Sequence, residues 1–161
     1  MKAQIYRFKM EYVGYEDKIN RVVDVSSNFT MAKLGYSVLA AFDTLANHLF
    51  GMTYKGKRYE IAIDEDFDES AIDLTTVKLN KLDLQVGDKI EMVYDYGCEQ
   101  EFVLTFEGVS EMVKGSGPSY PKIISGAGKG ILDNVFPDEF GEIIAEIDKN
   151  GISSHKYFSP R

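Results

Sequence analysis

Gln4 to Tyr12, with the sequence QIYRFKMEY, is the stretch that decides the fold class. Aromatic or apolar side chains fall at every second position, at Tyr6, Phe8, Met10 and Tyr12. The three residues between them are all charged. Because successive side chains of a strand point to opposite faces, this pattern predicts a half-buried strand. A turn at Gly14 to Asp17 and a second strand at Arg21 to Val25 would complete a hairpin.

The period changes after this hairpin. Ser26, Ser27, Asn28 and Thr30 offer side-chain oxygens for the free amides at a helix start. Apolar residues then recur at helical spacing, which predicts an amphipathic helix running to about Asn47 and packed on the sheet: Met31, Leu34, Val38, Ala41, Phe42 and Leu45.

The remaining chain predicts two more strand pairs. The first joins residues 48–54 and 58–63 through Lys55-Gly56-Lys57, and the second joins residues 90–94 and 102–106 through Tyr96-Gly97-Cys98. Residues 114–130 are rich in Gly, Ser and Pro, which favours irregular surface structure. Pro137, early acids and apolar spacing predict a short helix that ends near Gly151.

These elements predict an α+β fold in a single domain, with a mainly antiparallel sheet packed by one long and one or more short helices. The domain is expected to span residues 1–151, and residues 152–161 are expected to form a flexible C-terminal tail. No internal repeat of fixed period is present.

Composition excludes several classes of protein. The chain has 161 residues, 18 Lys and Arg against 26 Asp and Glu, and one cysteine, so an internal disulfide cannot form. The longest apolar run, residues 38–42, is far shorter than the roughly 20 residues of a membrane span, and the first residues lack a signal-peptide pattern. We expect a soluble, cytoplasmic protein without a membrane partner. The net charge of −8 disfavours nucleic acid, because phosphates would be repelled over most of the surface.

Two stretches match ligand-binding motifs only in part. Asp64 to Glu69 begins like a calcium loop, but Glu69 stands where glycine is needed and Thr75 where a bidentate glutamate is needed. Gly126 to Gly130 suggests a phosphate loop, but Gly130 replaces the magnesium-binding hydroxyl residue. We therefore expect no metal and no cofactor at these motifs.

Nucleophilic or metal chemistry would depend on few residues, because the chain has two histidines, His48 and His155, and Cys98. His48 is the most informative, since it stands at the expected junction of helix and strand. An isolated histidine at such a place is commonly a hydrogen-bonded structural residue, and carboxylate pairs for acid/base work are too numerous to choose among by spacing.

Several stretches together resemble the plasmid pRiA4b ORF-3-like family over most of residues 3–147. They include residues 21–25, 30–34 and 47–50, and above all Val93-Tyr94-Asp95-Tyr96-Gly97, which is similar to the family's tyrosine-aspartate-aromatic-glycine motif. Pro121 and Gly126 fit its proline and glycine segment, and Asp133 stands near its acidic position. The chain departs from the family at Cys98, Gln100 and Phe102, where an aspartate, a tryptophan and a histidine are common.

The resemblance implies an α+β domain, often encoded on plasmids or near mobile elements, with no established activity. Our leading hypothesis is a non-enzymatic binding or interaction module for an unknown protein or small-molecule partner. Its candidate residues are His48, Tyr94, Asp95, Tyr96, Gly97, Gly126 and Asp133. Asp95 is expected to bind backbone amides of the turn, and Gly97 to adopt a positive φ.

Two alternatives stay open. A metal-assisted hydrolase would use His48 with Asp95 and Asp133, provided that the three converge. A nucleic-acid-binding accessory protein would use tyrosines beside basic residues, as in Tyr54 to Tyr59, as a stacking platform. A homodimer through an exposed sheet edge also stays open.

Overall fold

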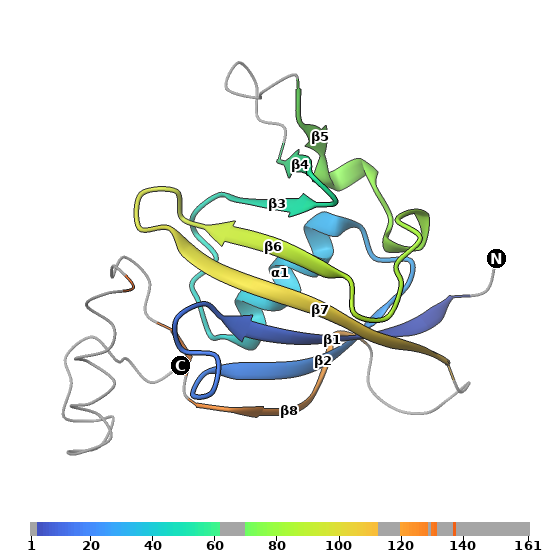
Figure 1. Cartoon of the computed structure of the whole chain (residues 1–161), viewed down its shortest axis with the longest axis horizontal. Helices are drawn as coiled ribbons and strands as arrows, with labels where there is room; N and C mark the ends of the chain where they lie inside the picture. The colour runs from blue at the N-terminus through green and yellow to red at the C-terminus, as the bar shows by residue number, and fades with distance from the viewer. Residues whose placement is uncertain (1–2, 62–69, 113–119, 129, 132–136, 138–161) are drawn as a thin grey trace.

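The computed structural model describes residues 3–61, 70–112, 120–128, 130–131 and 137. Within these residues, eight strands form one sheet in the order β5-β4-β3-β6-β7-β1-β2-β8, and one α-helix packs against it (Figure 1). The strands are β1 (Gln4–Tyr12), β2 (Asn20–Ser26), β3 (Phe50–Tyr54), β4 (Lys57–Glu60), β5 (Ile72–Asp73), β6 (Lys89–Tyr94), β7 (Gln100–Glu111) and β8 (Lys122–Ala127).

The sequence prediction of a mainly antiparallel α+β domain is confirmed. Every strand pair is antiparallel except β4 with β5, which makes the sheet mixed. The opening stretch forms β1 as expected, and it pairs with β2 on one side and β7 on the other. Phe8 therefore lies between Val23 and Phe106 across the sheet.

Helix α1 (Met31–Ala41) begins where the sequence predicts. The Thr30 hydroxyl accepts a hydrogen bond from the Lys33 amide at 3.1 Å, which satisfies one of the free donors of the first turn. Gly35 allows the helix to approach the sheet closely, because a Cβ built on it would lie 2.1 Å from the ring of Phe50.

The predicted length of this helix is wrong, since it ends at Ala41 and not near Asn47. Asp43 takes a φ of 59°, which leaves the helical conformation. The last carbonyls find partners elsewhere in the fold. The Arg21 guanidinium donates to the Ala41 carbonyl oxygen at 2.9 Å, and the Ile131 amide donates to the Phe42 carbonyl oxygen at 2.9 Å. Tertiary contacts therefore end the helix at Ala41, although apolar residues continue at helical spacing to Leu45.

The expectation of irregular structure over residues 114–130 also needs correction, because Lys122–Ala127 form β8 at one edge of the sheet. Residues 74–84 contain two 3₁₀ turns, η2 (Leu74–Thr76) and η3 (Leu79–Lys81). The acidic stretch Asp64 to Glu69, the expected helix from Pro137 to Gly151, His155 and the proposed tail 152–161 fall wholly or almost wholly outside the described residues.

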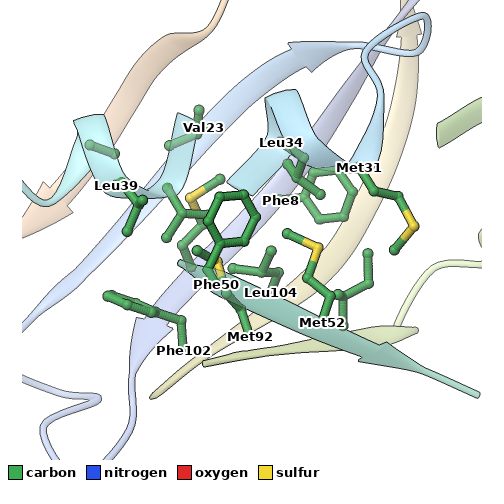
Figure 2. Close-up of a cluster of buried hydrophobic side chains, with 14 of the residues drawn as sticks. Phe8, Val23, Met31, Leu34, Leu39, Phe50, Met52, Met92, Phe102 and Leu104 are labelled. Carbon is green, nitrogen blue, oxygen red and sulfur yellow. The ribbon is translucent and has the colours of Figure 1, made fainter. Parts of the chain in front are cut away.

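The hydrophobic core lies between α1 and one face of the sheet, which we call the covered face (Figure 2). Alternate residues of the central strands meet the helix there, and their side chains are fully or almost fully buried: Phe8, Val23, Phe50, Met52, Met92, Phe102 and Leu104. The opposite face, which we call the open face, carries no helix among the described residues. None of the described helices is long and apolar enough to cross a membrane.

Candidate functional site

The open face is organised in two rows of side chains that run across the strands. The strand registers place Arg58, Thr53, Glu91, Val103 and Glu11 side by side in the first row. They place Glu60, Gly51, Val93 and Glu101 in the second row, which is two residues away from the first on each strand. Charged, apolar and small residues are therefore interspersed over this face of the sheet.

A groove with a volume of about 540 Å³ follows these rows. Its floor is formed by Thr53, Gly51, Val93 and Val103, and Val13, which continues from β1, closes one side. The Tyr96 ring lies above Gly51: a Cβ built on this glycine would be 2.6 Å from the Tyr96 hydroxyl oxygen. Because Gly51 has no side chain, the sheet leaves room for the ring at one end of the groove.

The groove carries an excess of negative charge. Arg58 and Glu60 form an ion pair with each other, so this arginine is already compensated. Glu91, Glu99 and Glu101 also line the groove. Within the described part of the chain, these three carboxylates take part in no ion pair. The groove therefore presents three uncompensated acids beside a floor that is partly apolar.

Tyr96 supplies an uncharged aromatic edge to this groove. The residue is 45% exposed, and partial burial raises the pKa of its phenol above the ordinary value. The nearby Glu60 carboxylate raises this pKa further, while Arg58 acts in the opposite direction. The phenol is therefore neutral at pH 7, with its ring face available for stacking and its hydroxyl for hydrogen bonds.

The Asp95 turn forms one end of the groove and connects it to the loop before β3. Asp95 has a φ of 61°, and its Oδ1 accepts hydrogen bonds from the amides of Gly97 and Cys98 at 3.1 and 3.4 Å. The amide of Asp95 donates to the Leu49 carbonyl oxygen at 2.9 Å. The prediction that Asp95 binds amides of the reversal is therefore confirmed.

Gly97 does not have the role that was predicted for it. The residues of this turn with positive φ are Asp95 and Glu99, and Gly97 is not among them. A Cβ at Gly97 would lie 3.4 Å from Asp95 Oδ1, which is close to an ordinary van der Waals contact, so neither the backbone nor the space at this position requires glycine.

His48 and Tyr94 lie on the other side of the same turn. His48 Nε2 is 3.5 Å from Asp95 Oδ2, and the His48 ring meets the buried Tyr94 ring edge-on with centroids 5.8 Å apart. The Tyr94 hydroxyl lies 3.3 Å from both the amide and the side-chain oxygen of Asn47. These contacts hold the loop before β3 against the turn, and they are compatible with either a structural corner or an acid/base pair.

The other two candidate residues lie elsewhere. Gly126 is in β8, separated from β6 by β7, β1 and β2, where a Cβ would come within 2.6 Å of the Asn20 carbonyl oxygen. Glycine at this position therefore allows β8 to pack closely against β2. Asp133 lies outside the described residues. Among the residues that the structure does describe, no three His, Cys, Asp or Glu side chains gather in a way that could hold a metal ion.

Sequence reasoning identified Tyr96 and missed the other lining residues of the groove. Glu101 and Val103 were recognisable as residues that alternate with the buried side of a strand, and so was Arg58. The two predicted hairpins place β3 beside β4 and β6 beside β7, but nothing in the linear pattern indicates that β3 pairs with β6, so the two rows could not be assembled.

Comparisons with known proteins agree with the fold. A sequence model described as "Plasmid pRiA4b ORF-3-like protein" matches residues 4–151. A solved structure of a protein of unknown function, MM3350 from Methanosarcina mazei Go1, is similar with a TM-score of 0.79 and 18% sequence identity. The match covers 97% of this chain and 86% of that one. No curated protein matches the chain significantly.

Proposed function

The chain belongs to the plasmid pRiA4b ORF-3-like family, and we propose that it acts as a non-enzymatic binding module. The open-face groove holds part of a partner. The observation that supports this proposal is the groove itself, which combines about 540 Å³ of space with an aromatic edge, valine side chains and charged groups. Binding sites commonly combine apolar surface with a few polar groups that fix the orientation of the ligand.

The rigidity of the floor also supports a binding role. Thr53, Val93 and Val103 belong to neighbouring strands whose opposite sides are buried in the core. Their positions are therefore fixed by packing that the ligand does not have to supply, and a preorganised surface loses less entropy on binding.

A peptide-display selection tests this function. The wild-type protein and a Val103→Trp variant are compared, because an indole on the floor would fill the groove. Val86→Trp is the matched control, since Val86 is 74% exposed and does not line the groove. We expect peptides that bind the wild type and Val86→Trp and lose binding to Val103→Trp. Selection of no peptide, or of peptides that bind all three proteins equally, would contradict the proposal.

The metal-assisted hydrolase remains a second candidate because His48 Nε2 lies 3.5 Å from Asp95 Oδ2. Elemental analysis of purified protein and thermal shifts with zinc, manganese and magnesium test this candidate. A bound metal that is lost in His48→Ala would support it, whereas no bound metal and no shift would remove it.

A further inference from the structure

We propose that the partner enters the groove as an extended peptide segment that carries arginine or lysine at alternate positions. This inference rests on the binding function proposed above and names the chemistry of its ligand.

Charge supports a basic partner. The groove presents Glu91, Glu99 and Glu101 without counterions in the described part of the chain, while Arg58 is compensated by Glu60. The whole chain has a net charge of −8, which attracts a cationic segment from a distance. An acidic or purely apolar ligand would instead cover these carboxylates without supplying partners, and this carries a desolvation cost.

The spacing of two glutamates supports alternate basic residues. Glu91 pairs with Val103, and Glu101 is two residues before Val103 on the same strand. Such diagonal positions in a sheet are about 7–8 Å apart. In an extended peptide, side chains at positions i and i+2 point the same way and are separated by about 6.6 Å, from a rise of about 3.3 Å per residue. Two basic side chains on one side of the peptide can therefore reach both carboxylates.

The neutral surfaces of the groove suit the rest of a basic side chain. Val93 and Val103 offer contacts for the methylene groups of lysine or arginine. The half-exposed Tyr96 ring offers a face on which a guanidinium can stack. The groove therefore offers contacts for both the apolar stem and the cationic end of a lysine or arginine side chain.

The width of the groove indicates the length of the segment. The lining residues extend from Arg58 on β4 to Val13 beyond β1, across the strand order β4-β3-β6-β7-β1. Four spacings of about 4.8 Å give a width of about 19 Å. An extended peptide of about six residues spans this distance at about 3.3 Å per residue.

The test uses fluorescently labelled hexapeptide pools and anisotropy. In one pool, arginine is fixed at two positions separated by one residue and the other four positions are randomised; in the second pool, citrulline, the uncharged isostere of arginine, replaces both. We expect the wild-type protein to bind the arginine pool at least tenfold more tightly than the citrulline pool. Equal binding of the two pools, or no binding of the arginine pool, would overturn the inference.

Protein variants locate the effect. E91Q/E101Q removes the two groove carboxylates, and E107Q/E111Q removes two charges from β7 positions that do not line the groove. We expect the first pair to weaken binding of the arginine pool at least tenfold and the second to change it less than threefold. An equal loss with both pairs would mean that overall charge and not the groove attracts the peptide, which would overturn the inference. Circular dichroism verifies that both variants are folded.

The peptide-display selection distinguishes failure of this inference from failure of the proposed binding function. If the selected peptides depend on an unfilled groove but are neutral or acidic, the binding function stands and the inference about basic residues is wrong. If no peptide depends on the groove, both fail. Tighter binding of a single-stranded oligonucleotide than of the arginine pool would also overturn the inference, because phosphates require positive charge.

Discussion

The covered and open faces of the sheet are made by the same strands and differ in what their side chains contact. On β7, Phe102 and Leu104 are buried beneath α1, whereas the intervening Val103 lies on the open face and remains partly exposed. One face therefore stabilises the fold through burial, and the other presents partly exposed side chains whose removal we expect to cost the fold little. The difference suggests where function can vary without loss of structure.

The largest expected effect comes from a matched pair of adjacent truncations. Leu104→Ala should lower the free energy of unfolding by about 2–5 kcal/mol, because it leaves a cavity under the helix. Val103→Ala should cost about 1 kcal/mol or less, since its side chain already contacts solvent. Urea unfolding at pH 7 measures both. Equal losses would show that the open face is packed against part of the chain and is not a free surface.

Two glycines give a second, smaller comparison. A Cβ on Gly35 would lie 2.1 Å from the Phe50 ring, which is fully buried beneath the helix and cannot move aside freely. Overpacking in Gly35→Ala should therefore destabilise the protein by about 1–3 kcal/mol. The higher helix propensity of alanine offsets up to about 1 kcal/mol of this loss.

Gly51→Ala tests the corresponding contact on the open face. The new Cβ would meet the hydroxyl end of Tyr96, which is 45% exposed and can rotate into solvent. We expect a change in stability below about 1 kcal/mol, together with weaker binding of groove-dependent peptides. Urea unfolding and anisotropy measure the two effects. A large loss of stability would show that Tyr96 is a structural residue, and unchanged peptide binding would show that it does not contact the ligand.

The two faces also differ in how far the sequence predicts them. The period of Tyr6 to Tyr12 predicts both β1 and its buried side, because burial on one face imposes alternation directly on neighbouring residues. Strand β8 lacks this signal: all of its residues are exposed, and only pairing with β2 defines it. The helix end was missed for a related reason, since Leu45 continues the apolar stripe in the sequence and is 59% exposed in the fold.

The candidate site divides in the same way. Asp95 binds amides two and three residues ahead, so local sequence predicts its role. The contact between Asp95 and His48 joins residues that are 47 positions apart, so no local pattern predicts it. The sequence predicts the hairpin of β6 and β7 that brings Glu91 near Glu101, but no local pattern predicts that β3 lies beside β6. The part of the groove that depends on pairing between distant strands is therefore what linear patterns omit.

The last comparison concerns the turn where the two faces meet, with Tyr94 on the covered side and Tyr96 over the groove. Asp95→Ala removes the acceptor of two amides and places alanine at a φ of 61°, so it should cost about 1–3 kcal/mol. Asp95→Asn keeps an acceptor oxygen and tolerates this φ, so it should cost less than about 1 kcal/mol.

Urea unfolding at pH 7 measures both Asp95 variants, with His48→Gln as a companion that keeps a polar side chain at the other end of the contact. If Asp95→Asn is as damaging as Asp95→Ala, the negative charge facing His48 contributes more than the amide contacts do. The turn would then be an electrostatic pair and not only a structural corner, and the acid/base hypothesis would gain the support that geometry alone does not give it. If asparagine is tolerated, the carboxylate serves mainly to shape the end of the groove.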